Sequence, residues 1–376
     1  MKIGIVCYPT FGGSGVMATE LGLALATKGH EIHFITYQQP VRLNVFRPNI
    51  YYHEVSVPKY PLFDFPPYET ALASTMVNVC VNHGLDVLHV HYAIPHASSA
   101  YFAREMVRKM GQNIPFITTL HGTDITLVGK DTTYAQVVSF SINESDAITA
   151  VSENLKAETY KNFNVEKDIH VIYNFVDENR FKKSDKEHFK QLIAPNNERI
   201  LVHVSNFRKV KRVEDVISAF EIIRREIPSK LLMVGDGPER QTAEDLCRKL
   251  NTCSDIRFLG KQDQLEDILS ISDLFILPSQ YESFGLAALE AMACGLPLIS
   301  SNAGGLPEIN TDGYSGYLSE VGDYRKMAAD AISILKDDAT LNQFKANALQ
   351  QASKFAIEKI VPQYEALYTE VANKNK

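Results

Sequence analysis

The chain has 376 residues, of which 45% are hydrophobic and 22% are charged, and its formal net charge is −7. This length exceeds what one hydrophobic core usually supports, so two domains are expected. The negative charge argues against a nucleic-acid surface, and no apolar run approaches the roughly 20 residues that cross a bilayer.

Five cysteines are scattered through the chain without a Cys-x-x-Cys pair. They are Cys7, Cys80, Cys247, Cys253 and Cys294. Such usage is typical of a reducing cytoplasm and predicts neither a disulfide framework nor a structural zinc site. The first residues run directly into an apolar strand without a signal peptide, so we expect a cytoplasmic protein with no membrane partner.

The first predicted elements are a strand over residues 2–7, a glycine-rich turn over 9–16 and a helix over 17–27. This order is typical of a doubly wound α/β domain. The glycines lack the Gly-x-Gly-x-x-Gly spacing and no acid ends the next strand, at 32–36, which disfavours a dinucleotide cofactor. The turn, which contains Gly13, either lets a phosphate or an acceptor come close or serves only as a turn.

Residues 42–69 hold five prolines among tyrosines and phenylalanines, which predicts an irregular segment. Such a segment suits a loop that lines a site, and the alternative is packing against the edge of the domain.

Three histidines, His89, His91 and His96, follow one another at short spacing and raise the question of a metal site. On a strand, His89 and His91 point to the same face as neighbours, and no cysteine or flanking acid completes a ligand set. We therefore expect no metal here, and no essential metal for the chain as a whole.

A further apolar strand, over residues 116–120, ends at His121 and Asp124. Ligands of open α/β sheets gather at the carboxyl ends of the strands, so both side chains are well placed to contact one. The next strand, over 147–151, leads to Ser152, which is a predicted helix N-cap.

The polar stretch over residues 178–199 is the best candidate for a domain boundary. We expect a first doubly wound domain over 1–178 and a second over 179–357. A helix in the remaining residues, 358–376, is expected to pack back towards the first domain.

The second domain is expected to repeat the parallel-sheet pattern. Its first strand, at 200–204, runs into a turn over 205–212 that carries four Lys and Arg residues in an acidic chain. A solvated surface is the simplest interpretation of such a run. Its place directly after a buried strand favours diphosphate binding by Arg208 and Lys211.

The chemistry is expected to concentrate at residues 280–290, which lie between an apolar strand and a helix. Ser283 is predicted to be the N-cap of that helix. The amides of Phe284, Gly285 and Leu286 would then be the free donors of the first turn, where a phosphate binds well.

Two acids flank this helix start. The eight positions from Glu282 to Glu290 correspond to roughly 9 to 12 Å along a helix axis. That length is close to a diphosphate with a sugar on either side. Glu282 is therefore expected to bind hydroxyls of one sugar and Glu290 those of a second.

The pattern of two acids separated by seven residues, with Phe-Gly after the first acid, resembles the donor-sugar signature of family 4, the retaining glycosyltransferases of the GT-B fold. The resemblance implies that Glu282 contacts the transferred sugar and that Glu290 contacts the nucleotide ribose. It also implies that His121 positions the sugar near its 6-hydroxyl and helps to stabilise charge.

The basic turn departs from the family pattern, in which an Arg follows a Gly and a Lys comes five residues later. Ser205 and Asn206 stand at the first place and Lys211 at the second, so Arg208 is only a proposed substitute for the missing Arg. The expected catalytic residues are thus His121, Arg208, Lys211 and Glu282. The expected donor-binding residues are Gly13, Asn206, Gly260, Ser283, Phe284, Gly285, Leu286 and Glu290.

Further phrases are similar to one branch of the family, which transfers N-acetylglucosamine from UDP-N-acetylglucosamine to L-malate in bacillithiol synthesis. These phrases are residues 12–16, 91–96, 120–124, 205–208 and 281–285. The resemblance spans nearly the whole chain and implies this donor, this acceptor, an α-linked product and no cofactor. The expected malate contacts are Ser14, Lys59, Tyr92, Thr118 and Thr119.

Several alternatives remain open. A family 4 enzyme with another acceptor, such as inositol phosphate or a lipid-linked sugar, is the nearest, although residues 1–180 contain no basic amphipathic helix for a lipid surface. A GT-B epimerase or phosphorylase and a non-catalytic nucleotide-sugar sensor are the others. The sequence leaves the oligomeric state open, a homo-oligomer included.

Overall fold

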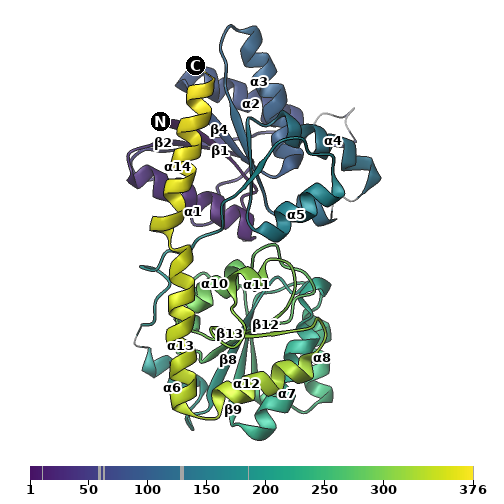
Figure 1. Cartoon of the computed structure of the whole chain (residues 1–376), viewed down its shortest axis with the longest axis vertical. Helices are drawn as coiled ribbons and strands as arrows, with labels where there is room; N and C mark the ends of the chain where they lie inside the picture. Colours follow the sequence, from purple (N-terminus) through teal and green to yellow (C-terminus); the bar gives the residue numbers. More distant parts are fainter. Residues whose placement is uncertain (11, 58–60, 62–63, 128–130, 185, 376) are drawn as a thin grey trace. The chain divides into compact units, whose positions relative to one another are not determined.

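The computed structural model describes residues 1–10, 12–57, 61, 64–127, 131–184 and 186–375 (Figure 1). The chain divides into two compact units. Unit 1 comprises Met1–Asn174 and Glu358–Lys376, and unit 2 comprises Phe175–Ile357. The sequence places the two boundaries after residues 178 and 357, and the structure places them after residues 174 and 357.

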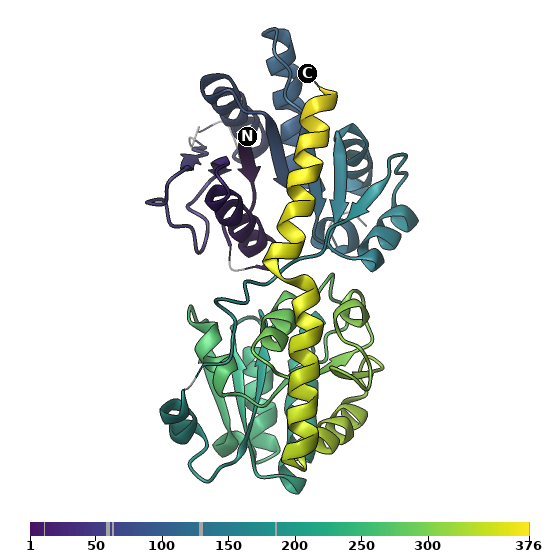
Figure 2. The ribbon, with the colours of Figure 1, turned by 60° about the vertical axis from the view of Figure 1, so that its left-hand side comes forward.

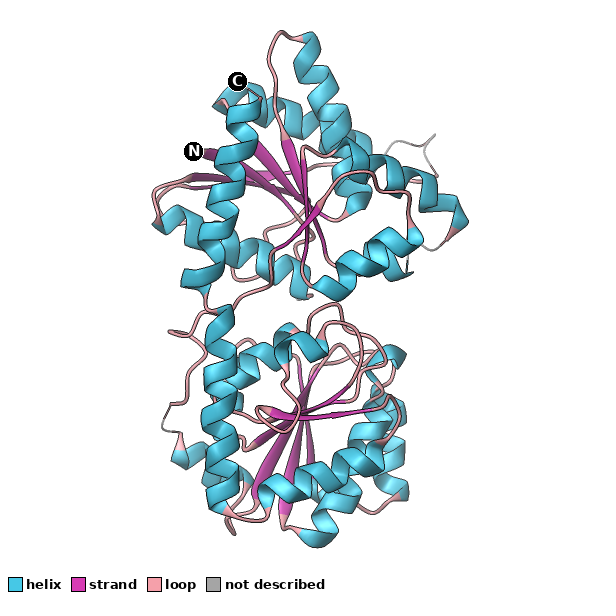
Figure 3. Ribbon diagram, in the orientation of Figure 1, coloured by secondary structure: helices cyan, strands magenta, loops and turns pink. Residues whose placement is uncertain are grey.

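In the described part of unit 1, seven strands form one sheet whose neighbouring strands all run parallel (Figure 3). The strands, in the order β3-β2-β1-β4-β5-β6-β7, are β1 (Lys2–Val6), β2 (Glu31–Thr36), β3 (Ile50–Glu54), β4 (Val87–His91), β5 (Phe116–Leu120), β6 (Ala147–Ala150) and β7 (Ile169–Val171). Every residue of β4, β5 and β6 is buried, as expected of strands covered on both faces. The order reverses between β1 and β4, and ligands of such sheets bind beyond the carboxyl ends of the strands at this point.

Five helices and two short helical segments of the described residues flank this sheet. They are α1 (Gly13–Thr27), α2 (Tyr68–His83), α3 (Ser98–Lys109), α4 (Thr132–Glu144) and α5 (Glu153–Asn162), with two short segments, η1 (Ala93–Ala97) and η2 (Thr123–Leu127). The Ser152 hydroxyl accepts a 3.1 Å hydrogen bond from the amide of Leu155, which confirms Ser152 as the N-cap of α5. Helix α1 begins at Gly13 rather than at residue 17, because the glycine turn itself continues into the first helical turn.

The C-terminal helix α14 (Ile357–Lys374) packs on unit 1 (Figures 1 and 2). Its Tyr368 is fully buried, and the phenol oxygen lies 2.7 Å from Nδ1 of His89 on β4. One turn earlier, Glu365 pairs with Lys28 at 2.6 Å and with His30 at 3.0 Å, just after α1. The C-terminal helix is therefore part of the core of unit 1.

Within the residues that the structure describes, unit 2 has a six-stranded sheet, again with parallel neighbours. The strands, in the order β10-β9-β8-β11-β12-β13, are β8 (Arg199–Val204), β9 (Ser229–Val234), β10 (Ile256–Gly260), β11 (Leu274–Leu277), β12 (Leu298–Ser301) and β13 (Gly316–Ser319). The helices are α6 (Glu187–Ile193), α7 (Val213–Glu226), α8 (Arg240–Lys249), α9 (Leu265–Ile271), α10 (Leu286–Ala293), α11 (Leu306–Ile309), α12 (Tyr324–Leu335) and α13 (Asp338–Ala352), with the short η3 (Lys209–Lys211), η4 (Cys253–Asp255) and η5 (Ser353–Phe355). The predicted α/β class, with two doubly wound parallel sheets, is confirmed. No helix in the described ranges is both long and apolar enough to cross a membrane.

Two stretches contain regular structure that the sequence did not predict. The proline-rich segment over 42–69 was expected to be irregular, yet β3 pairs there with β2. It forms because Ile50–Glu54 lies between the prolines. The polar boundary stretch contains α6, none of whose residues is buried.

The sequence predicted no disulfide framework, but the structure contains a disulfide bond. Cys247 and Cys253 are joined, with their Cα atoms 5.1 Å apart. They meet because the chain reverses at the end of α8, where Asn251 has a positive φ of 55°. The remaining cysteines, Cys7, Cys80 and Cys294, are buried and free, and burial raises the pKa of each thiol to about 12.

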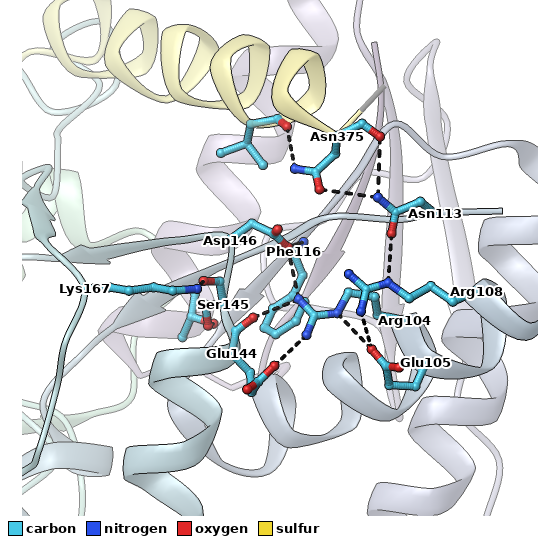
Figure 4. A network of polar contacts seen from close by, with 12 residues as sticks. Arg104, Glu105, Arg108, Asn113, Phe116, Glu144, Ser145, Asp146, Lys167 and Asn375 are labelled. Atoms are coloured by element: carbon cyan, nitrogen blue, oxygen red, sulfur yellow. Dashed lines mark hydrogen bonds and ion pairs between the residues drawn. The ribbon is translucent and has the colours of Figure 1, made fainter.

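Arg104 on α3 is a buried cation that ties three elements of unit 1 together (Figure 4). Its guanidinium donates to the carbonyl oxygen of Glu144 at 2.8 Å and to the carboxylate of the same residue at 2.9 Å. It also lies 3.4 Å from the carboxylate of Asp146 and 4.9 Å from the ring centroid of Phe116 on β5. Helix α3, the end of α4 and the start of β6 are thus held by one side chain.

We predict that Arg104→Ala lowers the free energy of unfolding by on the order of 3 kcal/mol, because Asp146 loses its cationic partner and keeps only the amide of Phe116. The figure lies at the low end of the range for buried pairs because the Glu144 side chain is 38% exposed. Arg108→Ala on the same helix is the control, since the side chains of Arg108 and its partner Glu105 are 44% and 41% exposed, and it should cost about 1 kcal/mol or less. Urea unfolding of the two variants measures the difference, and equal losses would contradict this role for Arg104.

Candidate functional site

The loops that follow β8, β9, β11 and β12 lie at one edge of the unit 2 sheet, because the strands are parallel. These loops hold the basic turn at 205–212, the glycine turn at 235–238, the acidic segment at 278–285 and a second glycine turn at 302–305. The carboxyl-terminal edge is where ligands of such sheets bind.

Lys211 and Glu282 form the central contact of this edge. The Lys211 ammonium donates to Oε1 of Glu282, although 71 residues separate them in the chain. The same oxygen accepts from the hydroxyl of Ser279 at 3.0 Å. The amide of Gln280 also donates to the carbonyl of Val210 at 2.7 Å, which ties the two loops through the backbone. The side chains are 18% and 14% exposed, so both reach the surface of the unit.

The second glycine turn holds the backbone of Glu282 in place. The amide of Gly305 donates to the carbonyl of Glu282 at 2.8 Å. A Cβ atom on Gly304 would lie 1.9 Å from that same carbonyl oxygen, and Gly304 has a positive φ of 59°. Only glycine fits so close an approach, so this turn fixes where the Glu282 segment lies.

The first glycine turn supports the basic turn in the same way. A Cβ atom on Gly235 would lie 1.8 Å from the carbonyl oxygen of Ser205, and one on Gly237 would lie 2.1 Å from that of Asn206. The carbonyl of Gly260 accepts from the amide of Gly235 at 2.8 Å. Gly260, an expected donor contact, therefore supports this turn from the end of β10.

His203 is a supporting residue that the sequence analysis missed. It lies fully buried in β8, with Nδ1 2.8 Å from the carbonyl of Ile276 on β11 and Nε2 2.8 Å from the hydroxyl of Ser205. Burial lowers its pKa to about 4, so the ring is neutral at physiological pH. Nδ1 then donates to the carbonyl, which can only accept, and Nε2 accepts from Ser205. The position of a histidine inside an apolar strand was the signal available for it.

Helix α10 starts later than predicted. Its N-cap is Gly285, with a positive φ of 97°, and not Ser283. The amides of its first turn therefore begin at Leu286. Only the four steps from Leu286 to Glu290 are helical, which is about 6 Å of rise, and the stretch from Glu282 to Gly285 lies before the helix. Glu290 itself is 5% exposed, on the second turn.

The remaining donor-site residues of unit 2 differ in burial. Arg208 and Asn206 are exposed, and Phe207 between them is fully buried with a positive φ of 38°. Phe207 thus anchors the turn that presents both side chains. Phe284 is buried and packs edge to face on Phe355 with ring centroids 5.6 Å apart, so its side chain belongs to the core of the unit.

In unit 1, His121 follows β5 as predicted and belongs to a chain of imidazoles. Its Nε2 lies 2.8 Å from Nδ1 of His91, and the rings of His91 and His89 lie 4.4 Å apart. Burial lowers the pKa of His121 to about 3, so it is a neutral donor and acceptor. That state favours a positioning role over the charge-stabilising role that the family resemblance implied.

The structure separates the expected acceptor residues into two groups. The hydroxyls of Ser14 and Tyr92 are 2.8 Å apart, at the start of α1 and the end of β4. Thr118 and Thr119 are fully buried, and their hydroxyls contact Ser145 at 2.7 Å and His89 at 2.6 Å, which speaks against a ligand contact for either. The hydroxyl of Thr119 also lies 2.6 Å from that of Thr149. Lys59 lies outside the described residues.

Two further residues near this edge have clear placements. Gly13 is exposed at the first position of α1, next to Ser14. Asp124 is 2% exposed, and its carboxylate accepts from the amides of Ala93 at 3.0 Å and Gly122 at 2.9 Å. Burial raises its pKa to about 6. Asp124 therefore braces the loops after β4 and β5 and is not aimed at a ligand.

Comparison with known proteins places this geometry in a family. The model of the glycosyl transferases group 1 matches residues 184–351, and that of glycosyltransferase family 4 matches residues 11–180. The chain is 50% identical over 378 aligned residues to the N-acetyl-alpha-D-glucosaminyl L-malate synthase of Bacillus anthracis, which covers 100% of this chain and 98% of that protein.

Solved structures show the same fold at lower identity. The sucrose-phosphate synthase of Thermosynechococcus elongatus superposes with a TM-score of 0.82 at 22% identity, covering 98% of each chain. The Anabaena protein HepE in complex with UDP-glucose gives 0.82 at 21% identity, covering 98% of this chain and 100% of that one. The chain therefore belongs to the family 4 glycosyltransferases and has their GT-B fold.

Proposed function

We propose that this enzyme transfers N-acetylglucosamine from UDP-N-acetylglucosamine to the hydroxyl of L-malate, releasing UDP and retaining the α-configuration. The observation that carries the proposal is the contact of Lys211 with Glu282 beside the start of α10. The name of the Bacillus anthracis relative, at 50% identity over the whole chain, supports the choice of sugar and acceptor.

Unit 2 is assigned to the donor. The Lys211 ammonium and the amides at the start of α10 supply positive charge for the diphosphate, with the exposed Arg208 as a further cation. Breaking the bond between sugar and phosphate builds negative charge on the leaving UDP. Fixed positive groups at that point lower the barrier because they need no rearrangement as the charge develops.

The two acids, Glu282 and Glu290, bind opposite ends of the donor. Glu282 lies beside Lys211 and accepts hydroxyls of the transferred sugar, and Glu290 accepts those of the ribose. His121, as a neutral imidazole, orients the sugar near its 6-hydroxyl, and His91 holds the ring of His121 in place. A donor phosphate oxygen takes the proton of the malate hydroxyl as that hydroxyl attacks from the face that UDP leaves.

Unit 1 is assigned to the acceptor. Ser14 and Tyr92 remain as candidates to bind malate, because their paired hydroxyls lie at the carboxyl-terminal edge of the unit 1 sheet. The amides of the first turn of α1, which begins at Gly13, are suited to a carboxylate.

The acceptor is tested by following UDP release from UDP-N-acetylglucosamine with L-malate, inositol phosphate or no acceptor. Of these three assays, we expect UDP release only in the one that contains L-malate. UDP release stimulated by inositol phosphate and not by L-malate would show that the acceptor is inositol phosphate, and the assignment to the glycosyltransferase family would stand. Consumption of the donor without any acceptor would indicate an epimerase or a hydrolase, and tight binding without turnover would indicate a sensor.

We predict that Lys211→Ala lowers kcat by about 10² to 10³-fold with a smaller change in KM, because its charge matters most as the bond breaks. Lys209→Ala is the matched control, since Lys209 is exposed two residues earlier on the same turn. Steady-state kinetics measure kcat and KM for both variants. A wild-type kcat in Lys211→Ala would show that Lys211 does not stabilise the leaving group.

We predict that Glu290→Gln weakens binding of UDP-N-acetylglucosamine by on the order of 1 to 3 kcal/mol, because the ribose loses a charged acceptor while the buried volume is kept. Glu320→Ala, at an exposed acid of the same unit, should leave the affinity unchanged. Calorimetric titration measures both. Wild-type affinity in Glu290→Gln would show that Glu290 does not contact the donor.

A further inference from the structure

Three histidines of unit 1 converge away from the candidate site. His33 comes from β2, His53 from β3, and His83 is the last residue of α2. One ring nitrogen of each lies within 4.8 Å of the others. In a doubly wound sheet the helix after a strand returns towards the amino-terminal edge, so the end of α2 is far along the sheet from the edge that holds His121.

The hydrogen bonds of this cluster fix the role of each ring nitrogen. Nε2 of His33 lies 3.0 Å from the Glu31 carboxylate, and its Nδ1 lies 2.9 Å from Nε2 of His53. A carboxylate only accepts, so Nε2 of His33 carries the proton and donates to Glu31. Nδ1 of His33 therefore carries no proton, and its lone pair points towards Nε2 of His53.

We propose that His33, His53 and His83 bind a divalent transition metal ion, with zinc as the expected ion. Three imidazole nitrogens suit zinc, nickel, copper or cobalt and do not suit magnesium or calcium, which prefer oxygen. Histidine ligands usually donate their second N–H to a carboxylate, which sets the tautomer and makes the ligating nitrogen more basic. Glu31 already does this for His33.

The spacing of the rings agrees with a tetrahedral ion. With Zn–N bonds of about 2.0 to 2.1 Å, ligand nitrogens lie about 3.3 Å apart and imidazole centroids about 5 Å apart. The centroids here are 5.1 Å apart for His33 and His53, 4.6 Å for His33 and His83, and 5.1 Å for His53 and His83. Binding would replace the hydrogen bond between His33 and His53 and would require that His53 carry its proton on Nδ1. It would also draw together the ring nitrogens, which lie within 4.8 Å of one another.

The charges around the cluster are compatible with a cation. Burial lowers the pKa of His33, and burial followed by the neighbouring imidazoles lowers that of His53 to about 4. Lys2 is the nearby cation; its ammonium lies 3.5 Å from the Glu31 carboxylate and donates to the carbonyl of His83 at 2.9 Å. The carboxylate thus offsets the charge of Lys2 beside the site.

The site is open on one side. His33 is fully buried, whereas His53 and His83 are partly exposed, so an ion can enter from solvent and keep a water molecule as its fourth ligand. Bound there, the ion would link the edge strand β3 and the end of α2 to β2. Such a link stabilises the folded chain, because the unfolded chain does not hold the three rings together.

The test is titration of the metal-free full-length chain with zinc, followed by calorimetry and by thermal unfolding. We expect a single ion per chain and a higher Tm with zinc. His53→Ala and His83→Ala, chosen because these rings are not fully buried, should abolish both effects. Glu31→Gln should weaken zinc binding by about 10 to 100-fold. His170→Ala, at an exposed histidine of the same unit, should behave as the wild type.

A second measurement covers the case in which a variant fails to fold. Wild-type crystals soaked in zinc should give an anomalous diffraction peak within bonding distance of all three rings. A peak elsewhere, no binding by the wild type, or undiminished binding by a folded His53→Ala chain would each overturn the proposal.

Discussion

The candidate site depends on one contact, the ion pair of Lys211 with Glu282. It joins the loop after β8 to the loop after β11, the two strands between which the order of the sheet reverses. Two glycine turns fix the backbone on either side, since Gly304 leaves no room for a side chain beside Glu282 and Gly235 leaves none beside Ser205. Opposite charges are thereby held at the edge of the sheet where ligands of open α/β sheets bind.

Buried neutral histidines support the loops in both units. His203 links β8 to β11 beneath the basic turn, and His91 and His89 connect His121 to the C-terminal helix through Tyr368. Their burial keeps these rings uncharged, so each acts as a donor and acceptor of fixed direction. Rigid support of this kind matters because small displacements of catalytic groups are costly.

The sequence predicted the fold because apolar runs mark the strands. It singled out Glu282 from the spacing of the two acids and Lys211 from the basic run that follows a strand. It failed where tertiary packing decides. Ser283 looked like an N-cap, but the close approach of the glycine turn shifts the start of α10 to Gly285. Thr118 and Thr119 looked available, but neighbouring strands place their hydroxyls on internal partners. The disulfide bond between Cys247 and Cys253 depends on a chain reversal that the spacing of the two cysteines in the sequence does not reveal.

The most direct test of the account is a crystal structure of the chain with UDP bound. The account predicts that the diphosphate lies within hydrogen-bonding distance of the Lys211 ammonium and of the first amides of α10, with the ribose hydroxyls on Glu290. A diphosphate bound at any other edge of unit 2, with Lys211 still paired only to Glu282, would contradict it.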